Sequence, residues 1–240
     1  MNLIVLAAGA GTRLGGRAKG LIGAGDGRPL MYHAAKNLMN HITQITVITG
    51  CYHDEYSHVY NDLGISTRFV LNPFWAISGN LSSVWLALEV TPPSEPFIIC
   101  NSDVVTSKEY CDKLVAHAEE NGAASALLQS GDITNRKIYA GMSVVVAQKE
   151  MRIVRARVSE LMQMTEENEE LRRHLGHWDV FCRPLPTPAY NPNSTNTVIA
   201  MFRENQTVRI PDDHRIEIDD LEDLIEFYRG RLAGRWGMMF

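Results

Sequence analysis

The sequence contains few cysteines and no long hydrophobic run. Its four cysteines show no C-x-x-C spacing, so neither a zinc site nor a disulfide framework is indicated, and we expect a protein of the reducing cytoplasm. No apolar stretch approaches the roughly 20 residues that cross a membrane. The apolar start is too short for a secretory signal and lacks its basic residues, so a first strand explains it better.

An excess of positive charge is also missing. The formal net charge is −5, which argues against a nucleic-acid-binding surface. The eight histidines show no metal-ligand spacing, and no Ser/His/Asp or Cys/His arrangement indicates nucleophilic catalysis. At 240 residues the chain is long enough for one large domain with a buried core, so we expect a single domain over residues 1–240.

Apolar and amphipathic stretches alternate along the chain. Short apolar runs predict strands at residues 3–6, 45–49, 69–71, 97–100, 124–128, 142–147 and 197–202. Helical spacing predicts helices at residues 29–40, 54–63, 81–90, 108–120, 158–175 and 221–232. Continuous apolar strands separated by helices are typical of a three-layer α/β fold, in which helices cover both faces of a mostly parallel sheet.

A glycine-rich segment follows the first predicted strand. Residues 6–21 read Leu-Ala-Ala-Gly-Ala-Gly-Thr-Arg-Leu-Gly-Gly-Arg-Ala-Lys-Gly-Leu. Gly9 and Gly11 allow backbone N–H groups to turn toward a ligand, and Arg13 and Lys19 add positive charge beside them. The spacing fits neither the P-loop nor the dinucleotide-binding pattern. We therefore expect a ligand that carries several phosphates.

This segment resembles the opening signature of nucleotidyltransferases, L-A-A-G-x-G-[ST]-R-[LM]-x-x-x-x-K, although Ala18 stands where the family usually has proline. The resemblance implies that the loop wraps a nucleotide triphosphate and that Arg13 and Lys19 are catalytic. An ordinary glycine-rich turn would explain neither of these two residues. The nucleotide contacts that the resemblance implies along the loop are Leu6, Ala7, Ala8, Gly9, Ala10, Gly11 and Thr12.

Carboxylates occur at two places that could hold a metal ion. Asp103 follows a predicted buried strand, at the edge where open α/β sheets bind ligands, although Asn-Ser-Asp is also common in turns. Glu217 and Asp219 alternate with isoleucines and so share one face of a predicted strand, while Asp220 suits a helix N-cap. Their segment resembles the late I-x-x-[IV]-D-[DT]-x-[ED]-D-L motif of the same family. We therefore predict Asp103, Asp219 and Glu217 as ligands of Mg²⁺.

A third block, at residues 71–84, combines Asn-Pro-Phe-Trp with small polar residues. It resembles the N-P-x-[FYW]-x-x-[SY]-x-N-[LI]-x-S segment of bacterial choline-phosphate cytidylyltransferases. The resemblance implies that Gly79, Asn80 and Ser83 lie near the cytosine ring of CTP. Asn80 can also serve as the cap of the helix that follows.

The acceptor site is expected in a subregion at about residues 133–196, which follows no pattern that we can match. Within it, Trp178, Asp179 and Tyr190 could form an aromatic and acidic pocket for a cationic head group, although core packing is the commoner fate of such aromatics. A nearby basic cluster is expected to be a solvated face rather than a phosphate site. It consists of Lys149, Arg152, Arg155 and Arg157.

These features together predict a Mg²⁺-dependent cytidylyltransferase that joins CTP to a small phosphate or phosphonate such as phosphocholine and releases pyrophosphate. A phosphate acceptor is already anionic near neutral pH, so no general base is needed. The alternatives within the enzyme class are the molybdenum-cofactor and isoprenoid-pathway nucleotidyltransferases, which the short loop before Lys19 also resembles, and a sugar-1-phosphate nucleotidyltransferase, which shares the opening motif. Outside that class, the alternatives are a nucleotide-binding regulatory protein without turnover and a pure interaction module. We expect no nucleic-acid or membrane partner. The apolar tail at residues 236–240 either docks on its own domain or is buried in a homodimer.

Overall fold

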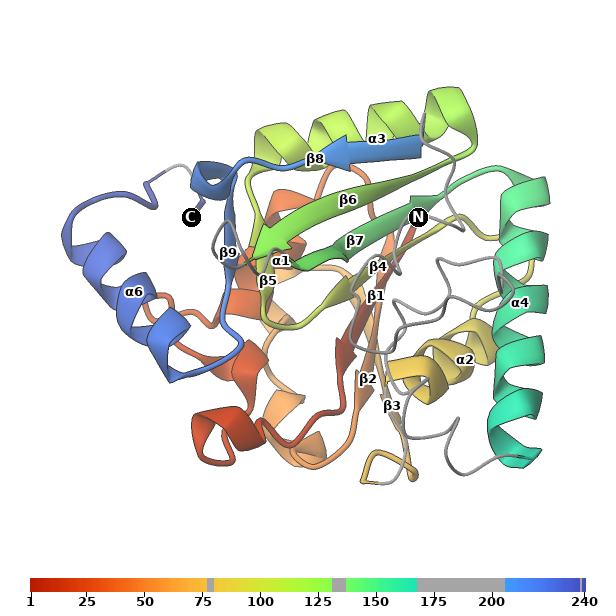
Figure 1. The fold of residues 1–240 in the computed structure, drawn as a ribbon, viewed down its shortest axis with the longest axis horizontal. Helices are drawn as coiled ribbons and strands as arrows, with labels where there is room; N and C mark the ends of the chain where they lie inside the picture. Colours follow the sequence, from red (N-terminus) through yellow and green to blue (C-terminus); the bar gives the residue numbers. More distant parts are fainter. Residues whose placement is uncertain (77–79, 131–136, 168–205, 238) are drawn as a thin grey trace.

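The computed structural model describes residues 1–76, 80–130, 137–167, 206–237 and 239–240 (Figure 1). The strands are β1 Asn2–Ala7, β2 Gln44–Thr49, β3 Ser66–Leu71, β4 Phe97–Asn101, β5 Val104–Thr106, β6 Ala123–Ser130, β7 Lys137–Val145, β8 Thr207–Arg209 and β9 Arg215–Glu217. The helices are α1 Leu30–Asn37, α2 Asn80–Val90, α3 Lys108–Asn121, α4 Gln148–Glu167 and α6 Leu221–Leu232.

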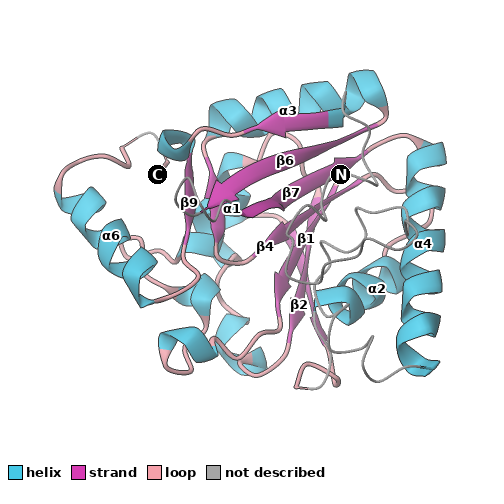
Figure 2. Cartoon of the chain, in the orientation of Figure 1, coloured by secondary structure: helices cyan, strands magenta, loops and turns pink. Residues whose placement is uncertain are grey.

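Parallel pairing dominates the main sheet, whose seven strands run in the order β3-β2-β1-β4-β7-β6-β8. Strands β1 to β4 are parallel to one another, β8 is parallel to β6, and β7 runs antiparallel to both β4 and β6. A separate two-stranded ribbon consists of β5 and β9. The predicted mostly parallel α/β fold is confirmed, and the carboxyl ends of β1 to β4 meet at one edge of the sheet (Figure 2).

Helices cover both faces of the sheet because side chains alternate along each buried strand. In β1, Leu3 and Val5 belong to the buried cluster that includes residues of α1 and α3. Ile4 and Leu6 belong to a second cluster, which includes residues of α2 and α4. The order of layers is therefore helix, sheet, helix, as the continuous apolar strands predicted.

Two predicted helices differ from the observed ones. Residues 54–63 form two short 3₁₀ segments instead of one α-helix. Their tyrosines Tyr56 and Tyr60 are buried in the core, and the Tyr60 hydroxyl donates to the carbonyl oxygen of Met31 at 3.1 Å, so tertiary packing holds this segment. Helix α4 begins at Gln148 rather than at residue 158, since Met151 and Val154 already pack into the cluster beneath it.

The basic cluster on α4 is not entirely solvated, which corrects our expectation for Arg155. Its guanidinium donates to the main-chain carbonyl oxygens of Leu88, Thr91 and Pro92 at 2.5, 2.9 and 3.1 Å. These carbonyls lie at and just beyond the C-terminal end of α2, where helical carbonyls lack intrahelical partners. Arg155 thus joins α4 to α2.

The C-terminal tail docks on its own domain. Trp236 and Met239 are buried in a third cluster together with Phe227 of α6 and Ile216 of β9. The side-chain amide of Asn37 donates to the carbonyl oxygen of Met239 at 3.1 Å. None of the helices in the described ranges is both long enough and apolar enough to cross a membrane.

Candidate functional site

The segment after β1 forms a tight loop that turns back on itself. Gly11 has a φ of +59°, and a Cβ there would lie 1.8 Å from the carbonyl oxygen of Arg17. Only glycine fits such a close backbone approach. A Cβ on Gly9, by contrast, would have no heavy atom within 4 Å, so the main chain at this residue faces open space. A ligand can approach the loop at Gly9.

The glycine loop is held by the turn that follows β2. The Tyr52 hydroxyl donates to the carbonyl oxygen of Ala10 at 3.1 Å, and the Cys51 N–H donates to that of Ala8 at 3.4 Å. Sequence reasoning missed Tyr52, because no periodic pattern marks a tyrosine in a turn. Of the predicted nucleotide contacts, Leu6 and Ala7 lie within β1 with buried side chains, so these two residues can offer only their main chain.

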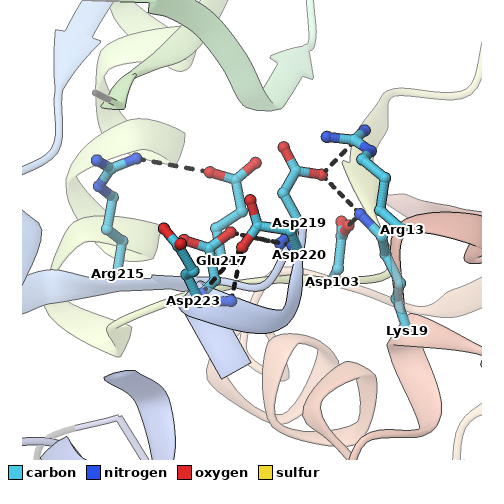
Figure 3. Close-up of polar contacts among 9 residues, drawn as sticks. Arg13, Lys19, Asp103, Arg215, Glu217, Asp219, Asp220 and Asp223 are labelled. Atoms are coloured by element: carbon cyan, nitrogen blue, oxygen red, sulfur yellow. Dashed lines mark hydrogen bonds and ion pairs between the residues drawn. The ribbon is translucent and has the colours of Figure 1, made fainter. Parts of the chain in front are cut away.

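Lys19 lies at the centre of the site. Its Nζ donates to Oδ2 of Asp103 at 3.0 Å and to Oδ1 of Asp219 at 2.6 Å (Figure 3). Gly20, the residue after the lysine, allows Lys19 to come close to Asp103. A Cβ on Gly20 would lie only 2.8 Å from the Cβ of Ser102. The glycine therefore lets the loop pack directly against the end of β4.

The ribbon of β5 and β9 brings the predicted metal ligands together. Val104 pairs with Glu217 in this ribbon, so Asp103, one residue before Val104, lies next to the end of β9. We predicted Glu217 and Asp219 on one face of a strand, but the strand ends at Glu217. Asp219 lies beyond it, in the turn that leads into α6.

The N-terminal end of α6 holds that turn in place. Asp220 is the N-cap, as predicted, and its carboxylate accepts the N–H groups of Glu222 and Asp223. The Asp223 carboxylate in turn accepts the N–H groups of Asp219 and Asp220 at 2.8 and 3.2 Å. This capping box fixes the main chain at Asp219. Arg13, on the glycine loop, reaches the Asp219 carboxylate at 3.4 Å (Figure 3).

In the described part of the chain, the site holds three carboxyl groups but only two cations, Lys19 and Arg13, that pair with Asp103 and Asp219. Burial, reinforced by the charges of Asp103 and Asp219, raises the pKa of Glu217 to about 9. Burial also raises the pKa of Asp103, against the influence of Lys19. For Asp219, which is more exposed, burial is outweighed by the hydrogen bond from Lys19, so its pKa is lowered. Glu217 is therefore protonated near neutral pH.

Two cationic side chains, Lys19 and Arg215, lie beside these carboxyl groups. Burial alone would lower the pKa of Lys19, but Asp103 and Asp219 outweigh it and raise that pKa, so the ammonium stays charged. Arg215, which sequence reasoning missed, lies 3.9 Å from a Glu217 carboxylate oxygen. Its guanidinium makes much shorter contacts with Asp212, at 2.8 and 3.0 Å, so it does not prevent the rise in the pKa of Glu217.

The donor set fits a hard divalent cation. Among the described residues, no group of three or more His, Cys, Asp or Glu side chains is arranged to hold a metal ion, so Asp103, Asp219 and Glu217 do not form a three-ligand site by themselves. Mg²⁺ does not need one, because it binds one or two carboxylates and completes its shell with water and substrate phosphates. Asp103 and Asp219 share one ammonium group, and their oxygens are the ligand type that this ion prefers.

The segment after β3 packs beside the glycine loop. A Cβ on Gly50, which follows β2, would lie 2.3 Å from the carbonyl oxygen of Ala8 and 2.6 Å from the Cβ of Trp75. The Asn72 amide donates to the hydroxyls of Ser82 and Ser83 at 2.9 and 3.1 Å. The chain after β1, β2 and β3 thus gathers at one sheet edge, as an α/β ligand site requires.

The residues predicted near the base have different surroundings. Ser83 is buried and its hydroxyl accepts the hydrogen bond from Asn72, whereas Asn80 starts α2 and is only partly buried. Gly79 lies outside the described residues. Contact of these residues with a base therefore stays a prediction.

The predicted acceptor residues Trp178, Asp179 and Tyr190 also lie outside the described residues. Part of the subregion expected to line the acceptor site is described. Its strand β7 lies between β4 and β6 in the main sheet, and its helix α4 contributes to the cluster beneath α2. These two elements thus belong to the main sheet and to the layer of helices on one of its faces.

Many solved structures share this fold, and three of them illustrate the likeness. CTP:phosphocholine cytidylyltransferase from Streptococcus pneumoniae (LicC) has a TM-score of 0.63 at 15% identity, over 95% of this chain and 97% of that one. 4-Diphosphocytidyl-2C-methyl-D-erythritol synthase from Anaerococcus prevotii has a TM-score of 0.64 at 14% identity, over 96% and 95%. A Bacillus anthracis protein assigned as a glucose-1-phosphate thymidylyltransferase has a TM-score of 0.58 at 19% identity, over 95% and 94%. At these identities the likeness shows a shared fold.

The sequence itself matches a family model. No curated protein matches the chain in sequence, but the model of the MobA-like NTP transferase domain matches residues 3–181. The match includes the glycine loop, Lys19 and Asp103, and it spans most of the main sheet. The chain therefore belongs to the family of MobA-like NTP transferase domains and is an enzyme of the nucleotidyltransferase type.

Proposed function

We propose that this enzyme transfers a cytidylyl group from CTP to a small phosphate or phosphonate and releases pyrophosphate, with Mg²⁺ as its cofactor and the cytoplasm as its location. The observation that carries the proposal is the position of Lys19, held between Asp103 and Asp219 beside a glycine loop that is open at Gly9. Similar solved structures include two that are named for cytidylyl chemistry, which supports CTP as the nucleotide.

The residues of the site have distinct roles in this proposal. The glycine-loop N–H groups and Arg13 hold the β- and γ-phosphates. Lys19, which stays charged, neutralises the negative charge that develops on the α-phosphate. Asp103 and Asp219, assisted by Glu217, would hold Mg²⁺, and the ion would supply positive charge that neutralises phosphate oxygens.

The chemistry needs positioning and charge neutralisation more than proton transfer. A phosphate monoester loses its second proton near pH 6, so the acceptor is already a nucleophile at neutral pH. The acceptor oxygen attacks the α-phosphorus, the bond to the bridging oxygen breaks, and pyrophosphate leaves with that electron pair. Holding both reactants in line at the sheet edge and neutralising the developing charge together supply the rate enhancement.

Pyrophosphate release tests the proposal. The purified enzyme is assayed with Mg²⁺ and each of the common nucleoside triphosphates, crossed with phosphocholine, 2-aminoethylphosphonate and glucose 1-phosphate. We expect release with CTP and one of the first two acceptors. Release only with glucose 1-phosphate supports a sugar-1-phosphate nucleotidyltransferase, the activity to which the similar Bacillus anthracis protein is assigned. CTP binding without release from any acceptor supports a regulatory protein.

Two substitutions test the roles assigned to the site. Lys19→Ala and Asp103→Asn should each lower kcat by about two orders of magnitude, the typical loss when one electrostatic stabiliser of a transition state is removed. Lys108→Ala and Asp112→Asn are matched controls, because these residues form an exposed ion pair at 2.7 Å on α3. Near-normal turnover in either site variant, with circular dichroism unchanged, contradicts the assignment.

A further inference from the structure

Four large apolar side chains of α6 are exposed, and one of them, Tyr228, also donates its hydroxyl to the carbonyl oxygen of Gly23 at 3.5 Å. Leu221 is 59% exposed, Ile225 43%, Tyr228 45% and Leu232 91%. The opposite side of the helix is the one that packs inward, through Phe227 and Gly230. Figure 1 shows α6 along one edge of the molecule. We call the four exposed side chains the α6 stripe.

The spacing of the α6 stripe is that of a helix–helix seam. Its members follow one another at intervals of four, three and four residues, which is the a/d pattern of paired helices. Contiguous exposed apolar residues of this kind mark interaction surfaces, because a monomer gains nothing from keeping them in water. The stripe is therefore suited to another helix.

The charged residues beside the α6 stripe favour one kind of partner helix. Glu222 and Arg229 are exposed and each comes one residue after a member of the stripe, at the flanking positions that form ion pairs between antiparallel helices. Glu222 and Glu226 lie in the first half of the helix, whereas Arg229 and Arg231 lie in its last turn. A helix with opposite charges at its two ends is complementary to a copy of itself that runs in the opposite direction.

We propose that α6 packs antiparallel on α6 of a second copy of this chain and forms a symmetric dimer. A two-fold axis between Ile225 and Tyr228 places each of them opposite the other, and places Leu221 opposite Leu232. Glu222 then faces Arg229 of the second copy, and symmetry repeats this contact. The two helix dipoles then run antiparallel, which is the favourable arrangement. An anionic membrane is a poorer partner, because the acidic half of α6 would be repelled from it.

The dimer is a weak one. A helix of 12 residues is about 18 Å long, so two such helices bury an area at the low end of specific interfaces. We expect a monomer at low micromolar concentration and a dimer at hundreds of micromolar. This association does not depend on the proposed reaction, because the stripe lies outside the residues assigned to it.

Sedimentation velocity over a range from about 1 to about 500 µM tests the association. The sedimentation coefficient of the wild type should rise with concentration toward that of a dimer. Ile225→Asp should abolish the rise, because it places a charge at the centre of the seam. Ile153→Asp is the matched control, since Ile153 on α4 is also 43% exposed. A wild type that stays monomeric, or a control that loses association equally, overturns the proposal.

A charge exchange tests the antiparallel geometry. Glu222→Arg and Arg229→Glu should each weaken self-association roughly tenfold, because both symmetric contacts become repulsive. An equimolar mixture of the two variants should associate again, since a mixed dimer pairs arginines of one chain with glutamates of the other. Failure of the mixture to recover, with both variants folded by circular dichroism, overturns this arrangement. Cosedimentation of a monomeric wild type with phosphatidylserine vesicles overturns it in favour of a membrane.

Discussion

The protonated state of Glu217 makes the stability of this protein depend on pH in a specific way. Its pKa rises from an ordinary value of 4.5 to about 9, first through burial and then through the charges of Asp103 and Asp219. Between these two pH values the folded chain keeps a proton that the unfolded chain has released. The free energy of unfolding must therefore fall as the pH rises through this window.

The size of the effect follows from linkage. One proton bound only by the folded state lowers the free energy of unfolding by roughly 1.4 kcal/mol per pH unit. Glu217→Gln removes the titration and keeps a neutral side chain of similar shape. Between pH 6 and pH 8 the wild type should therefore lose about 3 kcal/mol of stability relative to this variant.

Denaturant unfolding at pH 6, 7 and 8 measures this difference, with a chelator present to keep the protein free of metal. Glu226→Gln is the control, because this glutamate is exposed on α6 and pairs with Arg235. The free energies of unfolding of the wild type and of Glu226→Gln should then change equally with pH. If the free energies of the wild type and Glu217→Gln change in parallel, Glu217 is ionised at neutral pH and the reasoning from burial fails. Adding Mg²⁺ should flatten the wild-type slope, because a bound cation favours the ionised carboxylate.

Two further pairs of substitutions test the loop and the helix packing. Gly11→Ala should reduce nucleotide binding and thermal stability together, because its Cβ would collide with the Arg17 carbonyl. Gly9→Ala should fold normally but raise the KM for nucleotide, since its methyl group would enter the space on the ligand side; an unchanged KM refutes that position. Arg155→Met should cost about 1–3 kcal/mol of unfolding free energy by leaving carbonyls at the end of α2 without their donor. The exposed Arg152→Met on the same helix should change the melting temperature little, and equal losses in both variants would refute the α2 contact.

Six strands of the main sheet, β1 to β4, β6 and β7, and the glycine loop were predictable because their signals are local, whereas β8 was not predicted and the strand predicted at residues 197–202 lies outside the described residues. Each buried strand is a continuous apolar run, and the glycines come directly after the first of them. The capping role of Asp220 was also readable, since an aspartate before a helical pattern with another acidic residue three positions later is a short-range signal. Residues 54–63 were predicted wrongly, because the burial of Tyr56 and Tyr60 is a tertiary effect that overrides helical spacing.

The ribbon that assembles the site was beyond the reach of such local signals. Strands β5 and β9 have three residues each, too few to show a period, and their pairing joins Val104 to Glu217 across half of the chain. The start of α4 was missed for a related reason: charged residues between Met151 and Val158 obscure the apolar spacing that packs on α2. Tyr52 supports the glycine loop from a turn where sequence offers no pattern at all.

The charge arrangement argues that this site is built for a ligand rather than for stability. Lys19 joins Asp103, 84 residues away, to Asp219, 200 residues away, yet a largely buried ion pair contributes little to folding once the desolvation of both charges is counted. Glu217 makes the balance worse, because it adds a third carboxyl group that can only stay buried by keeping a proton. A folded protein gains nothing from such a cluster on its own. A divalent cation and a polyphosphate bound together would neutralise both the excess carboxylates and the cationic loop, and this shared need explains why the first loop and the last helix of the chain meet at one sheet edge.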